Sequence, residues 1–168
     1  MSRFPEGLAT SPGFLRWRLT LSWQRAITSA LAPIGLTHVQ FVLLACTWWL
    51  TEQGAAPNQL QLAHQAGTDP KMTSQVLRRL EAKRLITREV DRTDTRARRV
   101  RLTAQGASLA QRAITIVEDI DAQFFDCDAT FAPTLQRLLL QEAGPHPESS
   151  QGLDLGRGRS DEQRPTLS

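Results

Sequence analysis

The stretch that decides the fold is ITREVDRTDTRARRVRLTAQG, residues 86–106. Two β-prone flanks, residues 86–90 and 98–103, surround a polar segment, and Val100 and Leu102 alternate with charged residues on the returning flank. A period of two buries one face of a strand and exposes the other, so the pattern predicts a β-hairpin. Its tip is rich in arginine, and a short basic hairpin is suited to insertion beside a polyanion such as DNA.

The positive charge of the chain is concentrated around this hairpin. The 168 residues carry 20 basic and 17 acidic side chains, a net charge of +3. Residues 71–101 hold 11 basic and 4 acidic side chains, a balance of +7, whereas the other 9 basic and 13 acidic side chains give −4. A charged run is ordinarily a solvated surface. One contiguous positive segment beside a helix-turn-helix pattern instead favours a phosphate-binding face.

Helical patterns precede and follow the hairpin. Apolar residues recur at spacings of three and four over residues 14–32. Thr37 and Gln40 have capping-box spacing at the start of a second helix, which is apolar nearly all round to about Gln53 and is predicted to be the buried centre of the fold. After the hairpin, Thr103 is expected to cap a long helix to about residue 127, and another helix is expected over about 129–142.

A helix-turn-helix pattern lies directly before the hairpin. Asn58 and Gln61 have capping-box spacing at the start of a short helix that ends before Gly67. Asp69 is a good N-cap, and Pro70 suits the first position of a helix that runs to about residue 83. Two short helices joined by a glycine turn form such a motif. The residues expected in the core are Leu60, Leu62, Ala63, Met72, Val76, Leu77 and Leu80.

The composition excludes several classes of protein. No apolar run is long enough to span a membrane, and the first residues lack the apolar core of a signal peptide, so a cytoplasmic protein without a membrane partner is expected. Cys46 and Cys127 lack the spacing of a disulfide framework or a zinc site, and no metal or cofactor is expected. Residues 1–12 are predicted to be flexible and residues 144–168, rich in Gly, Pro, Ser and charge, to be disordered.

The order of elements, with the motif Asp94-x-Arg96-x-x-x-Val100-x-Leu102-Thr103-x-x-Gly106, resembles the MarR family of bacterial winged helix-turn-helix regulators over about residues 14–143. The segment Leu36-Thr37-x-x-Gln40 is also similar to the family's entry to its second helix. The resemblance implies a mainly α fold with a small β-hairpin wing, within one domain over residues 13–143. It places a DNA-binding lobe at about 55–103 and N- and C-terminal dimerisation helices at about 14–32 and 104–142.

The resemblance also implies which wing residues meet DNA. Arg96 corresponds to the arginine that enters the minor groove, where a narrow A·T-rich groove has enhanced negative potential. Asp94 would be repelled by phosphate and is expected to organise the tip. Other wing arginines are expected to contact mainly phosphates. The wing residues predicted to bind DNA are Arg92, Asp94, Arg96, Arg98 and Arg99.

The recognition helix implied by the resemblance covers residues 70–83. Its residues predicted to face DNA are Lys71, Thr73, Ser74, Gln75, Arg78 and Arg79. Because the N-terminal half of a recognition helix goes deepest, Ser74 and Gln75 are assigned to base edges, Lys71 to a base or phosphate, and the two arginines to phosphates. The chain departs from the family in two places. Arg84 stands where glycine often ends this helix, and Gln75 stands where arginine is frequent.

MarR-like regulators usually bind a small molecule, often phenolic, between the dimerisation helices and the DNA-binding lobe. The candidate residues here are Trp17, Trp23, His38 and Trp48. Each tryptophan is alternatively a core or dimer contact, and His38 a surface or capping residue. Cys46 lies in the most apolar segment and is predicted to be inert, while the carboxylates beside Cys127 disfavour its thiolate.

The basic wing and helix-turn-helix, together with the resemblance, favour a homodimeric transcriptional regulator that binds a pseudo-palindromic operator in double-stranded DNA. The resemblance further implies a repressor released by a small aromatic effector. The alternative is a winged-helix module that binds protein or RNA without transcriptional control, although such modules often lack a basic wing and recognition helix. An enzyme is disfavoured because the chain has neither a glycine-rich cofactor loop nor residues left for a catalytic domain.

Overall fold

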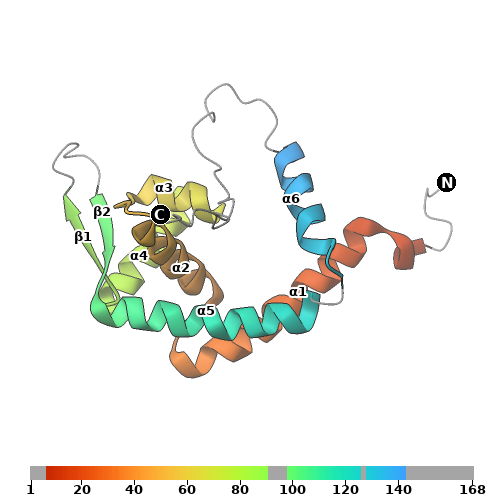
Figure 1. The fold of residues 1–168 in the computed structure, drawn as a ribbon, viewed down its shortest axis with the longest axis horizontal. Helices are drawn as coiled ribbons and strands as arrows, with labels where there is room; N and C mark the ends of the chain where they lie inside the picture. Colours follow the sequence, from red (N-terminus) through yellow and green to blue (C-terminus); the bar gives the residue numbers. More distant parts are fainter. Residues whose placement is uncertain (1–6, 91–97, 126–127, 143–168) are drawn as a thin grey trace, which may run out of the picture. The chain divides into compact units, whose positions relative to one another are not determined.

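A computed structural model describes residues 7–90, 98–125 and 128–142 (Figure 1). The chain divides into two units, Met1–Cys127 and Asp128–Ser168. The described part is mainly helical with one two-stranded antiparallel sheet, as predicted. The elements of the first unit are η1 (Gly7–Thr10), α1 (Pro12–Leu31), η2 (Ala32–Ile34), α2 (His38–Glu52), α3 (Gln59–Ala66), α4 (Pro70–Ala82), β1 (Ile86–Val90), β2 (Arg98–Leu102) and α5 (Ala104–Phe125).

Helix α2 is the centre of the core, as its sequence predicts. It packs against α1, α3, α4, α5 and β2, and Leu43 and Leu44 are completely buried. The predicted capping box at its start is present, because Gln40 N–H donates to Thr37 Oγ1 and Thr37 N–H donates to Gln40 Oε1, each at 3.3 Å. These bonds satisfy backbone donors that a helix start otherwise leaves unpaired.

The helix-turn-helix is formed by α3 and α4. The capping box of Asn58 and Gln61 opens α3, and Gly67 ends it in the left-handed conformation, at φ 60°. Asp69 Oδ1 then accepts hydrogen bonds from the backbone N–H groups of the first turn of α4, at 2.9 and 3.0 Å. Pro70 occupies the first position of that helix. All four local predictions are confirmed.

Two of the predicted core positions are wrong. Leu60 is 66% exposed and Met72 is 40% exposed, whereas Thr73 is completely buried. The buried stripe of α4 is Thr73, Val76, Leu77 and Leu80, which follows the spacing i, i+3, i+4, i+7. Met72 lies about 100° around the helix from Thr73, outside the stripe.

The wing is the antiparallel pair β1 and β2, in the register Ile86↔Leu102, Arg88↔Val100 and Val90↔Arg98. Ile86 and Val100 are buried, as the alternating pattern predicts. The wing is also joined to the segment before α3, because Val100 N–H donates to Pro57 O at 2.8 Å. The strands and the helix-turn-helix therefore share one core.

The long helix α5 begins against the end of α4. Thr103 caps it, since Gly106 N–H donates to Thr103 Oγ1 at 3.0 Å, and Thr103 N–H donates to Leu85 O at 3.0 Å. A Cβ atom on Gly106 would lie 1.8 Å from Leu85 O. The Leu-Thr-x-x-Gly part of the motif therefore forms a tight junction that only glycine fits. Farther along, α5 packs on α1 and α2 through Ala110, Ala113 and Val117.

The second unit contains α6 (Phe131–Glu142). Asp128 Oδ1 accepts hydrogen bonds from the backbone and hydroxyl of Thr130, which lower the pKa of that carboxyl and form the turn before the helix. Four large apolar residues of α6 are exposed: Leu135, Leu138, Leu139 and Leu140. The predicted tail, residues 144–168, lies outside the described residues.

Among the described residues, no single helix combines the length and hydropathy needed to cross a membrane. One bent pair, Pro12–Ile34 with His38–Glu52, meets both criteria when its members are taken together, with an angle of 76° between them.

Candidate nucleic-acid interface

Helix α4 presents one polar face to solvent. Lys71, Gln75, Arg78 and Arg79 are exposed, and Ser74 is half-buried beside them. The spacing i, i+4, i+7, i+8 places the four exposed residues on one side, opposite the buried stripe. A helix is about 10–12 Å wide with its side chains, which matches a major groove about 12 Å wide. The face therefore brings an amide and three cations to a single surface.

Thr73 does not belong to this face, and its predicted exposure to DNA is wrong. Its hydroxyl donates to Asp69 O at 2.9 Å, and a 2.8 Å hydrogen bond joins it to the Thr68 hydroxyl. With 0% exposure, the side chain cannot reach a base edge. Thr73 instead connects the turn of the motif to the first turn of α4.

Helix α4 ends without glycine, as the sequence predicts. Arg84 takes the left-handed conformation, at φ 58°. Arg84 N–H donates to Glu81 O at 2.8 Å, and Leu85 N–H donates to Leu80 O at 3.0 Å, which is the Schellman pattern. A left-handed residue other than glycine costs about 1–2 kcal/mol. The turn leads directly from the recognition helix into β1.

An ion pair connects α4 to the wing. Arg88 on β1 donates from Nε to Glu81 Oε2 at 2.9 Å, and its Nη2 bonds the same oxygen. The hydrogen bond from Arg88 lowers the pKa of Glu81, and the charges of Arg88 and Arg98 lower it further. The Arg88 side chain is only 16% exposed, so this member of the basic segment is engaged within the protein. The sequence carried no signal for this pair, because its members are brought together by the turn at Arg84.

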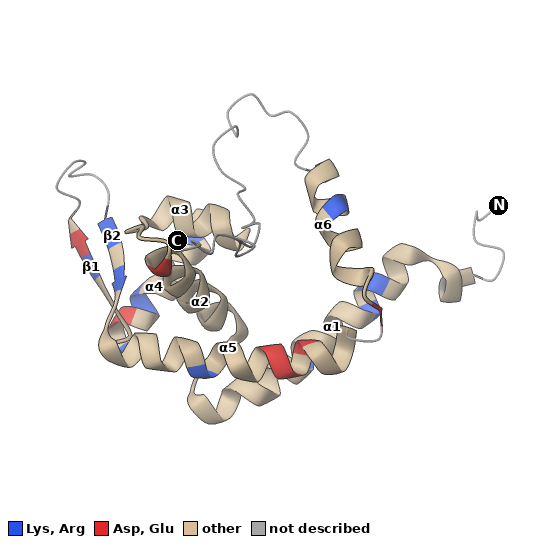
Figure 2. Cartoon of the chain, viewed as in Figure 1, with Lys and Arg blue, Asp and Glu red and all other residues tan. Residues whose placement is uncertain are grey.

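The predicted wing residues divide into two groups. Arg92, Asp94 and Arg96 lie outside the described residues. Of the other two, Arg98 is exposed on β2, and Arg99 is half-buried where β2 meets Asn58. Figure 2 shows basic residues along β2 and on α4, whereas acidic residues gather on the C-terminal half of α5. The basic wing strand and the polar face of α4 thus belong to one lobe.

Two of the four residues proposed for an effector form a separate cluster. Trp23 Nε1–H donates to Asp121 Oδ1 at 2.7 Å, and the Trp23 and His38 rings meet edge to face with centroids 5.1 Å apart. Burial lowers the pKa of His38, and the charge of Asp121 opposes part of that shift. The cluster joins α1, α2 and α5. His38 also lines an open cavity of about 460 Å3 with Thr28 and other residues of α1, α2 and α3.

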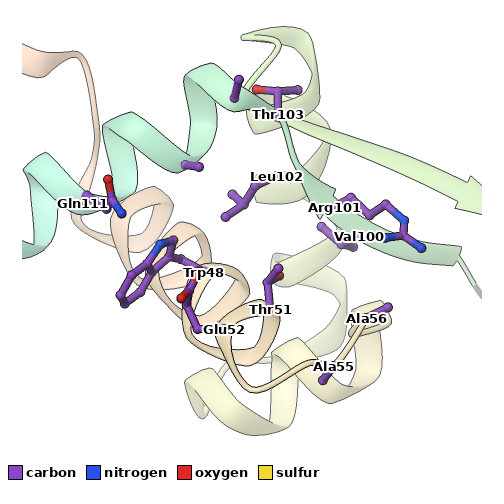
Figure 3. A pocket seen from close by; sticks show the side chains of 12 residues that line it. Trp48, Thr51, Glu52, Ala55, Ala56, Val100, Arg101, Leu102, Thr103 and Gln111 are labelled. Carbon is purple, nitrogen blue, oxygen red and sulfur yellow. The ribbon is translucent and has the colours of Figure 1, made fainter.

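Trp48 lines a different cavity, of about 330 Å3 (Figure 3). Its walls come from the C-terminal half of α2, from β2 and from the first turns of α5. Trp48 and Glu52 project from α2, Leu102 projects from β2, and the Arg101 side chain points away from the indole. Trp17 is 58% exposed on α1. His38 and Trp48, at the two ends of α2, line different cavities, and the effector role of the four residues stays a prediction.

One of the two cysteines lies among the described residues. Cys46 is half-buried, and burial raises the pKa of its thiol, which favours the unreactive form. Cys127 lies outside the described residues. Within the described ranges, no group of three or more His, Cys, Asp or Glu side chains is arranged to bind a metal ion.

The comparisons with known proteins agree with this geometry. The model of the MarR family matches residues 36–97, from the start of α2 to the wing. The chain is 42% identical to the uncharacterized HTH-type transcriptional regulator YdcH of Bacillus subtilis over 140 residues, which are 82% of this chain and 95% of the relative. The chain belongs to the MarR family. It is therefore a DNA-binding winged helix-turn-helix transcriptional regulator and not an enzyme.

Two further proteins are similar to this MarR-family chain. The HTH-type transcriptional repressor Rv2887 of Mycobacterium tuberculosis is 32% identical over 111 residues, covering 66% of this chain and 77% of the relative. The crystal structure of CouR from Rhodococcus jostii RHA1, bound to p-coumaroyl-CoA, superposes with a TM-score of 0.70 at 26% identity. That match covers 84% of this chain and 95% of CouR. The winged helix-turn-helix fold is thus shared along nearly the whole described chain.

Proposed function

We propose that this MarR-family chain is a homodimeric repressor that binds a pseudo-palindromic operator and is released by a small aromatic ligand. The observation that carries the proposal is the outward face of α4, which combines Gln75 with three cations beside a basic wing strand. Amide side chains bond base edges, and Lys and Arg bind phosphates or guanine.

Most of the predicted DNA-binding residues of the lobe are assigned a contact. Gln75 and Ser74 face base edges in the major groove, with Lys71 at a base or phosphate. Arg78 and Arg79, farther along α4, bind phosphates, as do Arg98 and Arg99 of the wing. Arg96 enters the flanking minor groove, and Asp94 organises the tip. The exposed positions of Lys71, Gln75, Arg78, Arg79 and Arg98 support these contacts.

Unpaired apolar surface supports the homodimer. Near its start α1 exposes Leu15, Trp17 and Leu19 at 47%, 58% and 37%, and α6 exposes four leucines. Exposed apolar residues on each of these helices favour burial against a partner, and a second copy is the commonest one. A two-fold dimer would place two recognition helices about 34–36 Å apart, in successive major grooves.

The Trp48 cavity supports a ligand-controlled repressor. It is bounded by β2 and by the start of α5, the elements that connect the wing to the long helix. A ligand that binds this cavity more tightly in one arrangement of the wing lowers DNA affinity by shifting the population. The aromatic thioester bound by CouR and the repressor function of Rv2887 support the ligand class and the direction of control.

The proposal is tested with an operator selected by the wild-type protein from random duplexes. Arg96→Ala is expected to weaken binding at least about tenfold and to reduce the salt slope by roughly one counterion. Arg112→Ala, on the exposed side of α5, is the control that removes an arginine outside the lobe. Release by aromatic acids is then measured on the same complex.

Three results would contradict the proposal. If Arg96→Ala binds the operator as tightly as the wild type, the assignment of Arg96 to the minor groove is wrong. A stable monomer at micromolar concentration in light scattering would contradict the two-fold dimer. Selection of RNA or protein in preference to duplex DNA would favour the alternative winged-helix module.

A further inference from the structure

Lys83, one of only two lysines in the chain, is bonded to a distant part of the fold. It is the C-cap residue of α4. Its Nζ donates to Gly35 O at 2.6 Å and to Gln40 Oε1 at 2.9 Å. Both acceptors belong to the junction between α1–η2 and α2, more than forty residues earlier in the chain. The end of the recognition helix is therefore bonded to the start of the central helix.

The junction is chemically suited to a cation. Gly35 ends η2 in the left-handed conformation, and its carbonyl lies at the C-terminal end of the α1–η2 segment, where the helix dipole favours positive charge. Gln40 is 5% exposed, and its Oε1 already accepts the Thr37 N–H of the capping box. A second donor satisfies the remaining lone pair of that buried oxygen. The Lys83 ammonium thus completes the hydrogen bonding of the α2 capping box.

We propose that Lys83 is a positioning residue for DNA recognition, which fixes the angle of α4 against α2 and makes no phosphate contact. The inference rests on the proposed function of α4 as the recognition helix. With the Glu81–Arg88 ion pair, Lys83 gives the C-terminal end of α4 two attachments, one to the α1–α2 junction and one to the wing. The outward face of the N-terminal half of α4, with Lys71 and Gln75, remains exposed for base edges.

The length of α4 amplifies a loss of this attachment. Twelve residues separate Lys83 from Lys71, which is about 18 Å along a helix. A tilt of about 5° at the Lys83 end would move the Lys71 end by about 1.6 Å. A base-edge hydrogen bond tolerates only about 0.5 Å. Loss of the attachment is therefore expected to weaken specific binding more than non-specific binding.

Salt dependence separates positioning from phosphate contact. The decisive variants are Lys83→Met, which keeps an unbranched apolar stem, and its matched control Lys71→Met. Affinities for the selected operator and for a random duplex are measured by fluorescence anisotropy at several salt concentrations. A lost phosphate contact reduces the slope of log K against log [salt] by about 0.9, and it weakens both duplexes.

We expect Lys83→Met to weaken operator binding about tenfold, with an unchanged salt slope and little change on the random duplex. Lys71→Met should reduce the slope. A slope for Lys83→Met that falls as in the control would show a phosphate contact and overturn the inference. If Lys83→Met binds the operator with the affinity of the wild-type protein, the inference is overturned as well. If the wild-type protein itself selects no operator, the proposed function fails instead.

A double-mutant cycle keeps the inference testable if either change reduces stability. Gln40→Met removes the acceptor and leaves the Lys83 charge in place. If Lys83 acts through Gln40, the effects of the two changes on operator affinity are not additive, and the double variant binds about as weakly as one single variant. Additive losses in the folded proteins would overturn the positioning role. Near-ultraviolet circular dichroism confirms that each variant is folded at the temperature of the titration.

Discussion

Gly106→Ala is expected to disrupt the junction of the recognition helix, the wing and α5. The added Cβ would lie 1.8 Å from Leu85 O and 2.8 Å from the carbonyl carbon, so backbone must move. Overpacking of this kind costs about 1–3 kcal/mol. Moving these two backbone segments apart also weakens the 3.0 Å hydrogen bond from Thr103 N–H to Leu85 O, which costs about 1 kcal/mol. The better helix propensity of alanine returns about 1 kcal/mol.

The net loss for Gly106→Ala is about 1–3 kcal/mol, which lowers Tm by roughly 2–12 °C for a domain of this size. Urea unfolding followed by tryptophan fluorescence measures it, at equal protein concentrations because dimerisation contributes to stability. Gly13→Ala in α1 is the matched control, since no atom lies within 4 Å of its added Cβ. It should be neutral or slightly stabilising. Equal stability of the two variants would refute the steric argument.

Two further predictions follow from buried groups. Thr73→Val should lower the free energy of unfolding by about 1–2 kcal/mol, because Thr68 and Asp69 lose a hydrogen-bond partner, while operator affinity of the folded protein is retained. A large loss of affinity at unchanged stability would show instead that Thr73 reaches DNA. The pKa of His38 is lowered chiefly by burial, so between that pKa and 6.5 the unfolded state binds more protons. The free energy of unfolding should therefore decrease as the pH falls from about 6.5 through this window. His38→Gln should make the free energy of unfolding less dependent on pH, as measured by urea unfolding at about pH 7.5 and 5.5. An equally steep dependence in the variant would contradict this assignment.

Local features of the fold were predictable because their partners are neighbours in the chain. The capping boxes at Thr37 and Asn58 and the Asp69 cap each join residues at most three positions apart. The left-handed turn at Arg84 follows from the end of a helical pattern directly before a strand. The hairpin and the burial of Val100 follow from the alternation of apolar and charged residues on its returning strand. In each case a short segment contains both groups that interact.

Features that depend on the rotation or docking of elements were not predictable in the same way. Met72 and Thr73 differ by one position, and only packing of α4 on the core determined that the threonine is inside. His38 and Trp48 lie ten residues apart on α2, about 15 Å along its axis, and the different elements packed around the two ends of that helix give them different cavities. Periodicity specifies the spacing of a stripe and leaves its exact phase to tertiary contacts.

The sequence alone was enough to predict a helix-turn-helix followed by a basic hairpin, because periodicity, caps and the hairpin pattern are encoded within short segments, and its resemblance to the MarR family implied a transcriptional regulator. The tertiary structure was needed to show what the charged residues do. Arg88 and Lys83 belong to the same basic segment as Arg78 and Arg98, but the first two bond Glu81 and the α1–α2 junction. Charge is a property of the residue, whereas its partner depends on which distant groups the fold brings within about 3 Å.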